Sequence, residues 1–278
     1  MNRRDGNAPA APPGFAAGAK KHLGQNFLHD KDVIDKIVRA IDPKPGDALV
    51  EIGPGQGALT FPLLDTHGEL TAIEFDRDLH APLQAAARAH GTLHLIEGDV
   101  LGVDFTALAA RAGDAQGQLR LAGNLPYNLS SPILFHALDH AAAIRDMYFM
   151  LQKEVVERMA AGPGTKVYGR LSVMLQAYCA VTPLFTVPPG AFRPAPKVES
   201  AVVRLVPKPA EGIEVADRTA FADVVRAAFG QRRKTLRNAL NGVADAAAIE
   251  AAGLRADARA EQVEVAGFVR LANLLAAG

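Results

Sequence analysis

The sequence predicts an α/β fold, in which a mostly parallel sheet of seven strands has helices on both faces and a small all-helical domain follows. Short apolar runs typical of buried strands alternate with segments of helical periodicity up to about residue 150. This alternation favours a parallel sheet covered on both faces. Pro207, Pro209 and Gly212 then interrupt the chain, and the sequence beyond them is helical and rich in alanine. We therefore expect domains at residues 20–208 and 209–278, preceded by a flexible tail at residues 1–19.

The individual elements are expected from the spacing of apolar residues. Residues 33–41 place apolar side chains on one helical face, and Pro43 and Gly46 end that helix. Five strands separated by helices are expected at residues 48–52, 70–73, 93–96, 119–122 and 147–151. Two more strands, 181–187 and 200–206, are joined by a short Pro-rich loop and should pair antiparallel. Further helices are expected at residues 78–89, 132–138 and 221–229.

The composition is ordinary for a globular protein, with 49% hydrophobic and 22% charged residues among 278. Cys179 is the one cysteine, so the chain cannot form an internal disulfide, which fits a reducing compartment. Residues 1–19 lack the apolar run of a signal peptide, and no apolar stretch is long enough to span a bilayer. We expect a cytoplasmic protein that binds no membrane. His and Cys residues do not cluster as ligands, so we also expect no metal.

Charge is balanced over the whole chain but not along it. The formal net charge is zero, yet residues 190–240 carry 10 Lys and Arg against 5 Asp and Glu. A basic segment in a neutral protein suggests one face for an anionic partner, but charge alone favours a solvated charged surface.

A glycine-rich turn follows the first expected strand. It contains Gly53, Gly55 and Gly57, and glycine lets a backbone turn tightly and approach a ligand closely. The strand before it and the helix after it favour a nucleotide-type ligand over a purely structural turn. Because Ala58 completes the pattern G-x-G-x-x-A, a dinucleotide-binding fold remains an alternative.

Two acidic residues end the next two strands, at the sheet edge where ligands bind in such folds. Glu74 can accept hydrogen bonds from both hydroxyls of a ribose, in a dinucleotide as well as in other adenosine cofactors. Asp99 can accept a hydrogen bond from the amino group of an adenine. Taken singly, Glu74 also fits a solvated strand end, and Asp99 fits a turn or helix-capping residue.

The run Gly123-Asn124-Leu125-Pro126-Tyr127-Asn128 follows the fourth strand. An adenine amino group is a poor nucleophile, because its lone pair is delocalised into the ring. Two acceptors aimed at its hydrogens, the Asn124 side-chain oxygen and the Leu125 carbonyl, can expose that lone pair. Pro126 restricts the backbone between them, so the geometry is preorganised. Tyr127 offers a face on which a base can stack, a contact worth about 1–3 kcal/mol. A polar turn with a buried tyrosine is the structural alternative.

Two other segments are candidates for contact with a nucleic acid. In the Pro-rich loop after residue 190, Phe192 can close the other side of a base pocket or belong to the core. Arg193 and Lys197 in that loop can reach phosphates or lie on a plain surface. Residues 231–237 are expected to start a helix with several cations within two turns, which suits phosphate contact. These cations are Arg232, Arg233, Lys234 and Arg237.

Together these residues resemble the ribosomal RNA adenine dimethyltransferases, and the resemblance covers about residues 20–240. The matching runs, in order, are residues 24–28, 51–60, 98–99, 124–132, 152–155, 168–172, 192–200 and 229–240. The resemblance implies a Rossmann-like class I methyltransferase domain that binds S-adenosylmethionine, with a helical domain that contacts RNA. It also implies a reaction, the dimethylation at N6 of two adjacent adenines in the 3′-terminal hairpin of 16S rRNA during small-subunit assembly.

The resemblance assigns roles to individual positions. Asn26 and Leu28 would close over the cofactor, and Gly53 would line its methionine part. Gly55 and Asn124 would also contact the cofactor. Glu74 would bind the ribose and Asp99 the adenine. Asn124 would bind the target amine, and Tyr127 and Phe192 would sandwich the target base.

Three other functions remain open at this stage. A large-subunit adenine methylase of the antibiotic-resistance type shares the cofactor and amine sites. A non-catalytic RNA-binding relative would not need Asn124 and Tyr127, which are both present. An NAD oxidoreductase shares the glycine turn but not the run from Asn124 to Tyr127. We expect a monomer whose partner is the precursor of the small ribosomal subunit.

Overall fold

The computed structural model describes residues 20, 24–209 and 214–277. The expected tail at residues 1–19 and the start of the expected second domain at residues 210–213 lie outside the described residues. The chain divides into two compact units. The first joins residues up to 136 to residues 188–197, and the second contains residues 137–187 and those from 198 onward. None of the boundaries between the two units coincides with the expected domain boundary near residue 208.

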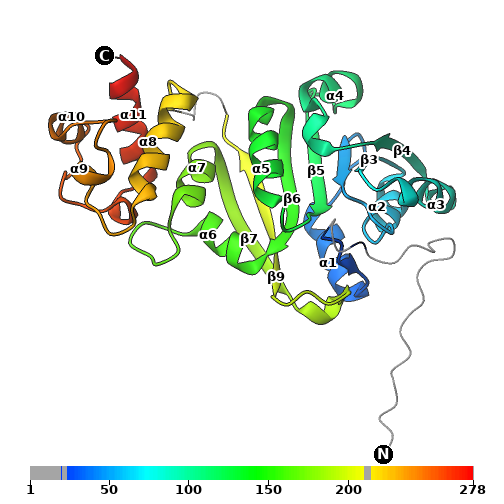
Figure 1. Cartoon of the computed structure of the whole chain (residues 1–278). Helices are drawn as coiled ribbons and strands as arrows, with labels where there is room; N and C mark the ends of the chain where they lie inside the picture. The colour runs from blue at the N-terminus through cyan, green and yellow to red at the C-terminus, as the bar shows by residue number, and fades with distance from the viewer. Residues whose placement is uncertain (1–19, 21–23, 210–213, 278) are drawn as a thin grey trace, which may run out of the picture. The chain divides into compact units, whose positions relative to one another are not determined.

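The first unit contains four parallel strands in the order β4-β3-β2-β5 (Figure 1). Their bounds are β2 (Leu49–Ile52), β3 (Glu69–Glu74), β4 (Thr92–Glu97) and β5 (Leu119–Asn124). All four residues of β2 are buried, as a strand covered on both faces requires. Each of the four strands was expected from the sequence, with ends that differ by one or two residues.

Helices connect these strands, as expected for parallel pairs. They are α2 (Thr60–His67), α3 (Arg77–Ala87), η2 (Val100–Gly102) and α4 (Phe105–Ala112). In addition, α1 (Lys31–Ile41) precedes β2, and α5 (Ser130–Asp139) follows β5. The predicted apolar face of α1 is buried, and Asp30 begins this helix by accepting a hydrogen bond from the Val33 amide at 3.1 Å. Leu79 and Leu83 of α3 pack against Phe27 and Phe61.

A second sheet of two strands was not expected. Strand β1 (Phe27–Leu28) pairs antiparallel with β8 (Phe192–Arg193), which follows η4 (Pro189–Ala191). The His29 amide extends this pairing by donating to the Ala191 carbonyl at 2.9 Å. Segments more than 160 residues apart in the sequence therefore meet in the first unit.

The second unit contains three antiparallel strands in the order β6-β9-β7. They are β6 (Ile144–Gln152), β7 (Cys179–Val187) and β9 (Ser200–Pro207), accompanied by η3 (Ala141–Ala143), α6 (Lys153–Ala160) and α7 (Arg170–Tyr178). The predicted antiparallel pairing of the last two strands is confirmed. With the four strands above they form a seven-stranded sheet in the order β4-β3-β2-β5-β6-β9-β7, which confirms the predicted α/β fold.

After β9, the described residues of the second unit form helices joined by turns and loops, as predicted. The helices are α8 (Arg218–Gly230), α9 (Leu236–Ala239), α10 (Ala246–Ala251), η6 (Ala260–Gln262) and α11 (Val265–Ala277). The predicted apolar face of α8 is buried, and Phe229 packs against Phe268 with ring centroids 5.5 Å apart. The expectation of a helix starting at residue 231 is wrong. Residues 231–234 form a turn between α8 and α9, because the backbone leaves the helical region at Gln231, with φ −131° and ψ 86°.

Candidate functional site

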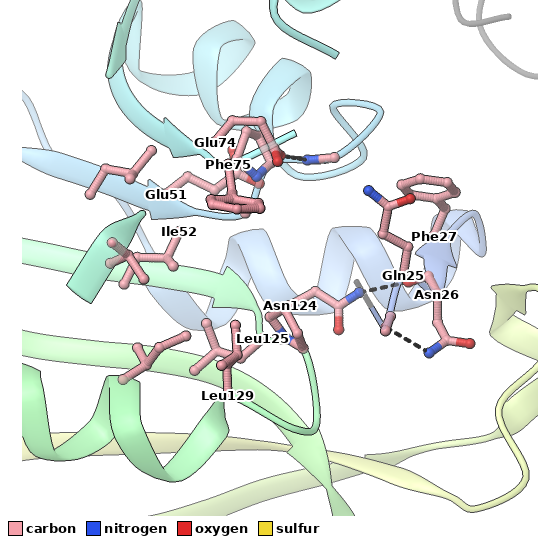
Figure 2. A pocket seen from close by; sticks show the side chains of 18 of the residues that line it. Gln25, Asn26, Phe27, Glu51, Ile52, Glu74, Phe75, Asn124, Leu125 and Leu129 are labelled. Carbon is pink, nitrogen blue, oxygen red and sulfur yellow. Dashed lines mark hydrogen bonds between the residues drawn. The ribbon is translucent and has the colours of Figure 1, made fainter. Parts of the chain in front are cut away.

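A cavity opens in the first unit, where the strands of the parallel sheet end (Figure 2). Its lining comes from the turns after β2, β3, β4 and β5, and from the segment at residues 24–28. The carboxyl edge of a parallel sheet collects residues that are far apart in sequence. The predicted cofactor and amine residues therefore meet here, although each was inferred from a different strand.

The glycine turn after β2 forms one wall of the cavity. Gly53 and Gly55 adopt φ values of 68° and 59°, which disfavour any side chain. A Cβ at Gly55 would lie 3.2 Å from the ring of Phe27, so glycine also makes room for β1. The Gly53 amide donates to the Ile73 carbonyl at 2.9 Å, which ties the turn to β3.

Glu74, the last residue of β3, is 6% exposed and lies beside this turn. Its Oε2 accepts from the Gly55 amide at 3.0 Å, and its Oε1 accepts from the Asp76 amide at 2.7 Å. Burial raises the pKa of this carboxyl above its ordinary value, while the two amides oppose the rise. Each carboxylate oxygen can accept a further hydrogen bond, so Glu74 is held in place and can still bind the hydroxyls of a ligand.

Phe75 is a site residue that sequence reasoning missed. Its ring is 60% exposed although it follows a buried strand, and it lines the cavity beside Glu74. An exposed aromatic ring at a cavity can cover the flat face of a heterocycle. The available signal was an apolar residue between two acidic ones, Glu74 and Asp76, where the strand had already ended.

Asp99 lies at the cavity and also caps a helix. Its carboxylate accepts from the Leu101 amide at 3.0 Å, which begins η2, and its side chain is exposed. The cap uses one lone pair of one oxygen and leaves the carboxylate able to accept another donor. The capping and ligand-binding interpretations are therefore compatible.

Asn124 ends β5 and projects its amide at the cavity. The Asn124 Nδ2 donates to the backbone carbonyl of Asn26 at 2.9 Å, shown as a dashed line in Figure 2. Among the residues that the structure describes, no hydrogen bond reaches the Asn124 Oδ1 or the Leu125 carbonyl. The Pro126 carbonyl accepts from Leu129 and Ser130 instead, and this turn leads into α5. Tyr127 is half-buried and lines the cavity.

The amino-terminal segment covers part of the same cavity. Asn26 and Leu28 both line it, and Leu28 is held in β1 opposite Phe192. The Asn26 side chain donates to the Gly24 carbonyl at 3.2 Å, so it is the backbone of Asn26 that contacts Asn124.

Phe192 lies outside the cavity lining. Its ring is 2% exposed, and the residue pairs with Leu28 in the two-stranded sheet. Arg193 in β8 and Lys197 in the loop after it are exposed.

Glu51 was not assigned a role from the sequence. It is 2% exposed, lines the inner wall of the cavity, and accepts a hydrogen bond from the Thr60 hydroxyl at 2.6 Å. Burial raises the pKa of Glu51 to about 8, and the nearby Glu74 carboxylate adds to the rise, while the Thr60 hydroxyl opposes it. The group therefore holds a proton at neutral pH.

The predicted phosphate-binding cations lie in the second unit. Arg232, Arg233 and Lys234 are exposed on the turn after α8, and Arg237 is exposed in α9. Arg232 donates to the Lys166 carbonyl at 2.5 Å, which orients one guanidinium.

Neither a metal-binding cluster nor a membrane-spanning helix is found in the described part of the chain. No cluster of three or more His, Cys, Asp or Glu side chains has the arrangement of a metal site there. Nor is any helix among these residues both long enough and apolar enough to cross a bilayer.

A family model, a curated relative and two solved structures that resemble this chain agree with one another. A family model described as "Ribosomal RNA adenine dimethylase" matches residues 16–277. The chain is 70% identical over 260 residues to "Ribosomal RNA small subunit methyltransferase A" of Xanthomonas campestris pv. campestris, covering 94% of this chain and 97% of that protein. A dimethyladenosine transferase structure from Plasmodium falciparum aligns with a TM-score of 0.76 and 26% identity, over 88% of this chain and 95% of the other. The structure of the 23S rRNA methyltransferase ErmE aligns with a TM-score of 0.68 and 25% identity, over 90% and 100% of the two chains.

Proposed function

The chain belongs to the ribosomal RNA adenine dimethylase family, and from that premise we propose that it dimethylates N6 of two adjacent adenines in the 3′-terminal hairpin of 16S rRNA. It is an S-adenosylmethionine-dependent rRNA methyltransferase with a Rossmann-like fold. The assignment of the target atom rests on the orientation of the Asn124 amide. Its nitrogen donates to the backbone of this chain, and its oxygen remains available at the cavity.

The residues at the cavity fit S-adenosylmethionine. Glu74 has both carboxylate oxygens fixed by amides and retains acceptor capacity for two ribose hydroxyls. Asp99 offers an acceptor for the adenine amino group, and Phe75 offers a face for its ring. The turn at Gly53 and Gly55 lets the methionine part approach the backbone closely. The bound cofactor supplies an electrophilic methyl group on a sulfonium.

The chain prepares the adenine amine to attack. The Asn124 oxygen and the Leu125 carbonyl accept the two amine hydrogens, which draws the nitrogen toward a pyramidal geometry and frees its lone pair. Both acceptors sit on a turn stiffened by Pro126, so little reorganisation is needed during the reaction. The proton released by the alkylated nitrogen passes to water, and no side chain is required as a strong base.

Stacking holds the flipped-out base in place. Tyr127 supplies one face from its half-buried position at the cavity, a contact worth about 1–3 kcal/mol. Phe192 supplies the other face in our proposal, which requires its ring to leave the buried position opposite Leu28 when RNA binds. Replacing Tyr127 or Phe192 by Leu should raise the KM for RNA while leaving cofactor affinity unchanged.

The amine assignment is tested with Asn124→Ala. Single-turnover methylation should fall by about two orders of magnitude or more, because acceptors that act in the transition state contribute mainly to the chemical step. Calorimetry should show cofactor affinity close to that of the wild type. Asn238→Ala, an exposed position in α9, is a matched control that should react normally. A normal rate in the Asn124 variant would refute the acceptor mechanism.

The substrate is tested with labelled cofactor. Unmethylated small subunits should take up four methyl groups, two on each of the adjacent adenines, when the modified bases are mapped. Large subunits should take up none. Methylation of large-subunit RNA instead would favour the activity that its name gives to the ErmE relative.

We propose that RNA phosphates are bound by basic residues of the second unit, of β8 and of the loop that follows β8. The cations concerned are Arg193, Lys197, Arg232, Arg233, Lys234 and Arg237. Replacing the last four by Gln should weaken binding to the subunit. It should also flatten the plot of log affinity against log salt by about 0.7–0.9 per lost phosphate contact. An unchanged slope would place the RNA surface elsewhere. Our proposal further includes a cytoplasmic monomer that needs no metal.

A further inference from the structure

Asp76 is buried at the point where the amino-terminal segment meets the cavity. Its side chain is 4% exposed and accepts from the Lys20 ammonium at 2.5 Å and from the Gln25 amide nitrogen at 2.8 Å. The Lys20 backbone amide in turn donates to the Gln25 Oε1 at 2.8 Å. One carboxylate therefore binds two residues of the amino-terminal segment, and we call Lys20 together with residues 24–28 the strap.

A neighbouring residue of the strap, Asn26, contacts the amine site. Asn26 lies one residue after Gln25, and its backbone carbonyl accepts from the Asn124 Nδ2 at 2.9 Å. An amide side chain can place either its oxygen or its nitrogen toward a neighbour. A carbonyl can only accept, so this contact requires the nitrogen to face the strap and presents the oxygen to the substrate.

We propose that Asp76 is a positioning residue for methyl transfer, because it holds the strap in the place from which the Asn26 carbonyl orients the Asn124 amide. This inference rests on the proposed role of Asn124 and adds the residue that keeps its oxygen turned toward the amine. Gln25 transmits the effect, since it contacts Asp76 and is bonded directly to Asn26.

The local chemistry suits a fixed anchor. Burial alone would raise the pKa of Asp76, but hydrogen bonds from Lys20, Gln25 and the Asp78 amide lower it below its ordinary value. The carboxylate is therefore ionised at neutral pH and can hold the Lys20 cation. Asp76 also begins α3 as its capping residue and donates its own amide to Glu74, which connects the strap to the ribose-binding carboxylate.

The test compares Asp76→Asn with Asp78→Asn. Asparagine caps a helix as well as aspartate does, so both variants should fold, with thermal midpoints near that of the wild type. Asp78 also contacts Lys20, at 2.6 Å, but it is 63% exposed and makes no contact with Gln25. A third variant, Gln25→Met, keeps the length of the side chain and removes both of its hydrogen bonds.

Two measurements are needed. Hydrogen exchange followed by mass spectrometry, on the protein without cofactor, reports how firmly residues 24–28 are held. Single-turnover methylation at saturating cofactor reports the orientation of Asn124 separately from cofactor affinity. We expect faster exchange in the strap and a rate about 10- to 100-fold lower for Asp76→Asn and Gln25→Met, since small misplacements of reacting groups have effects of this size. Asp78→Asn should stay within about twofold of the wild type, as expected for an exposed ion pair.

Three outcomes would overturn the inference. Unchanged exchange in Asp76→Asn would show that the carboxylate does not hold the strap. Faster exchange with an unchanged rate would show that Asn124 is oriented without it. Equal effects of Asp76→Asn and Asp78→Asn would mean that general loss of charge is responsible. If the wild type methylates no RNA, the proposed function is wrong, and the exchange comparison still decides whether Asp76 anchors the strap.

Discussion

Glu51 allows a quantitative prediction about stability and pH. Its carboxyl is 2% exposed beneath the glycine turn and keeps its proton up to a pKa of about 8 in the folded chain. In the unfolded chain the same group loses its proton near its ordinary value of 4.5. Between these two pH values the folded state binds one proton more than the unfolded state. Stability from this group is therefore fully present below about pH 4.5 and is lost as the pH rises toward 8.

The size of the effect follows from the width of this window. Each pH unit within it changes the free energy of unfolding by about 1.4 kcal/mol. A window of roughly 3 units then gives a loss on the order of 3–5 kcal/mol between pH 5 and pH 8. Glu51→Gln removes the titration and keeps the shape of the side chain and its acceptor for the Thr60 hydroxyl.

The assay is urea unfolding of the wild type and of Glu51→Gln at several pH values from 5 to 8. Other titrating groups contribute almost equally to both proteins, so the difference in unfolding free energy isolates Glu51. The variant should gain stability relative to the wild type with each pH unit. Parallel curves would show that Glu51 is ionised in the folded protein and that the reasoning from burial is wrong.

Three further predictions concern cofactor binding, reactivity and stability. Glu74→Gln should weaken S-adenosylmethionine binding by about 1–3 kcal/mol in calorimetry, because an amide nitrogen cannot accept a hydrogen bond from a ribose hydroxyl; unchanged affinity would remove Glu74 from the site. Cys179, whose pKa burial raises to about 12, should react with a thiol reagent only after unfolding, and rapid labelling of the native protein would contradict this. Arg120→Met should lower the free energy of unfolding by about 3–5 kcal/mol, since the buried Asp47 carboxylate at 2.7 Å loses its cation, and a loss under 1 kcal/mol would disagree.

Most of the fold could be predicted because its elements are encoded by local patterns. The strands of the sheet are apolar runs bounded by turns, and α1 and α8 carry regular apolar faces. The meeting of the candidate cofactor residues at one cavity was predictable for the same reason. Glu74 and Asn124 each end a strand, and the topology of a parallel sheet brings such ends together.

What could not be predicted depends on contacts between distant segments. Nothing near Phe27 or Phe192 in the sequence shows that the two short strands pair, because the register is set by contacts across more than 160 residues. The turn at residues 231–234 was mistaken for a helix start because its cations have helix-compatible propensities. Gln231 nevertheless leaves the helical region, and local propensity is a weak guide where tertiary packing decides.

Asn124 shows what the local sequence and what contacts between distant segments each determine at the candidate site. Its place at the end of β5, before Leu125 and Pro126, follows from the local sequence and is enough to propose an amine-binding role. In our proposal, the Asn26 carbonyl, 98 residues earlier in the chain, decides which atom of this amide faces the substrate. An acceptor role requires the oxygen, and a reversed amide would direct N–H groups at an amine that itself carries hydrogens. On this proposal, the local motif supplies the residue, and the distant strap supplies the orientation that its acceptor role requires.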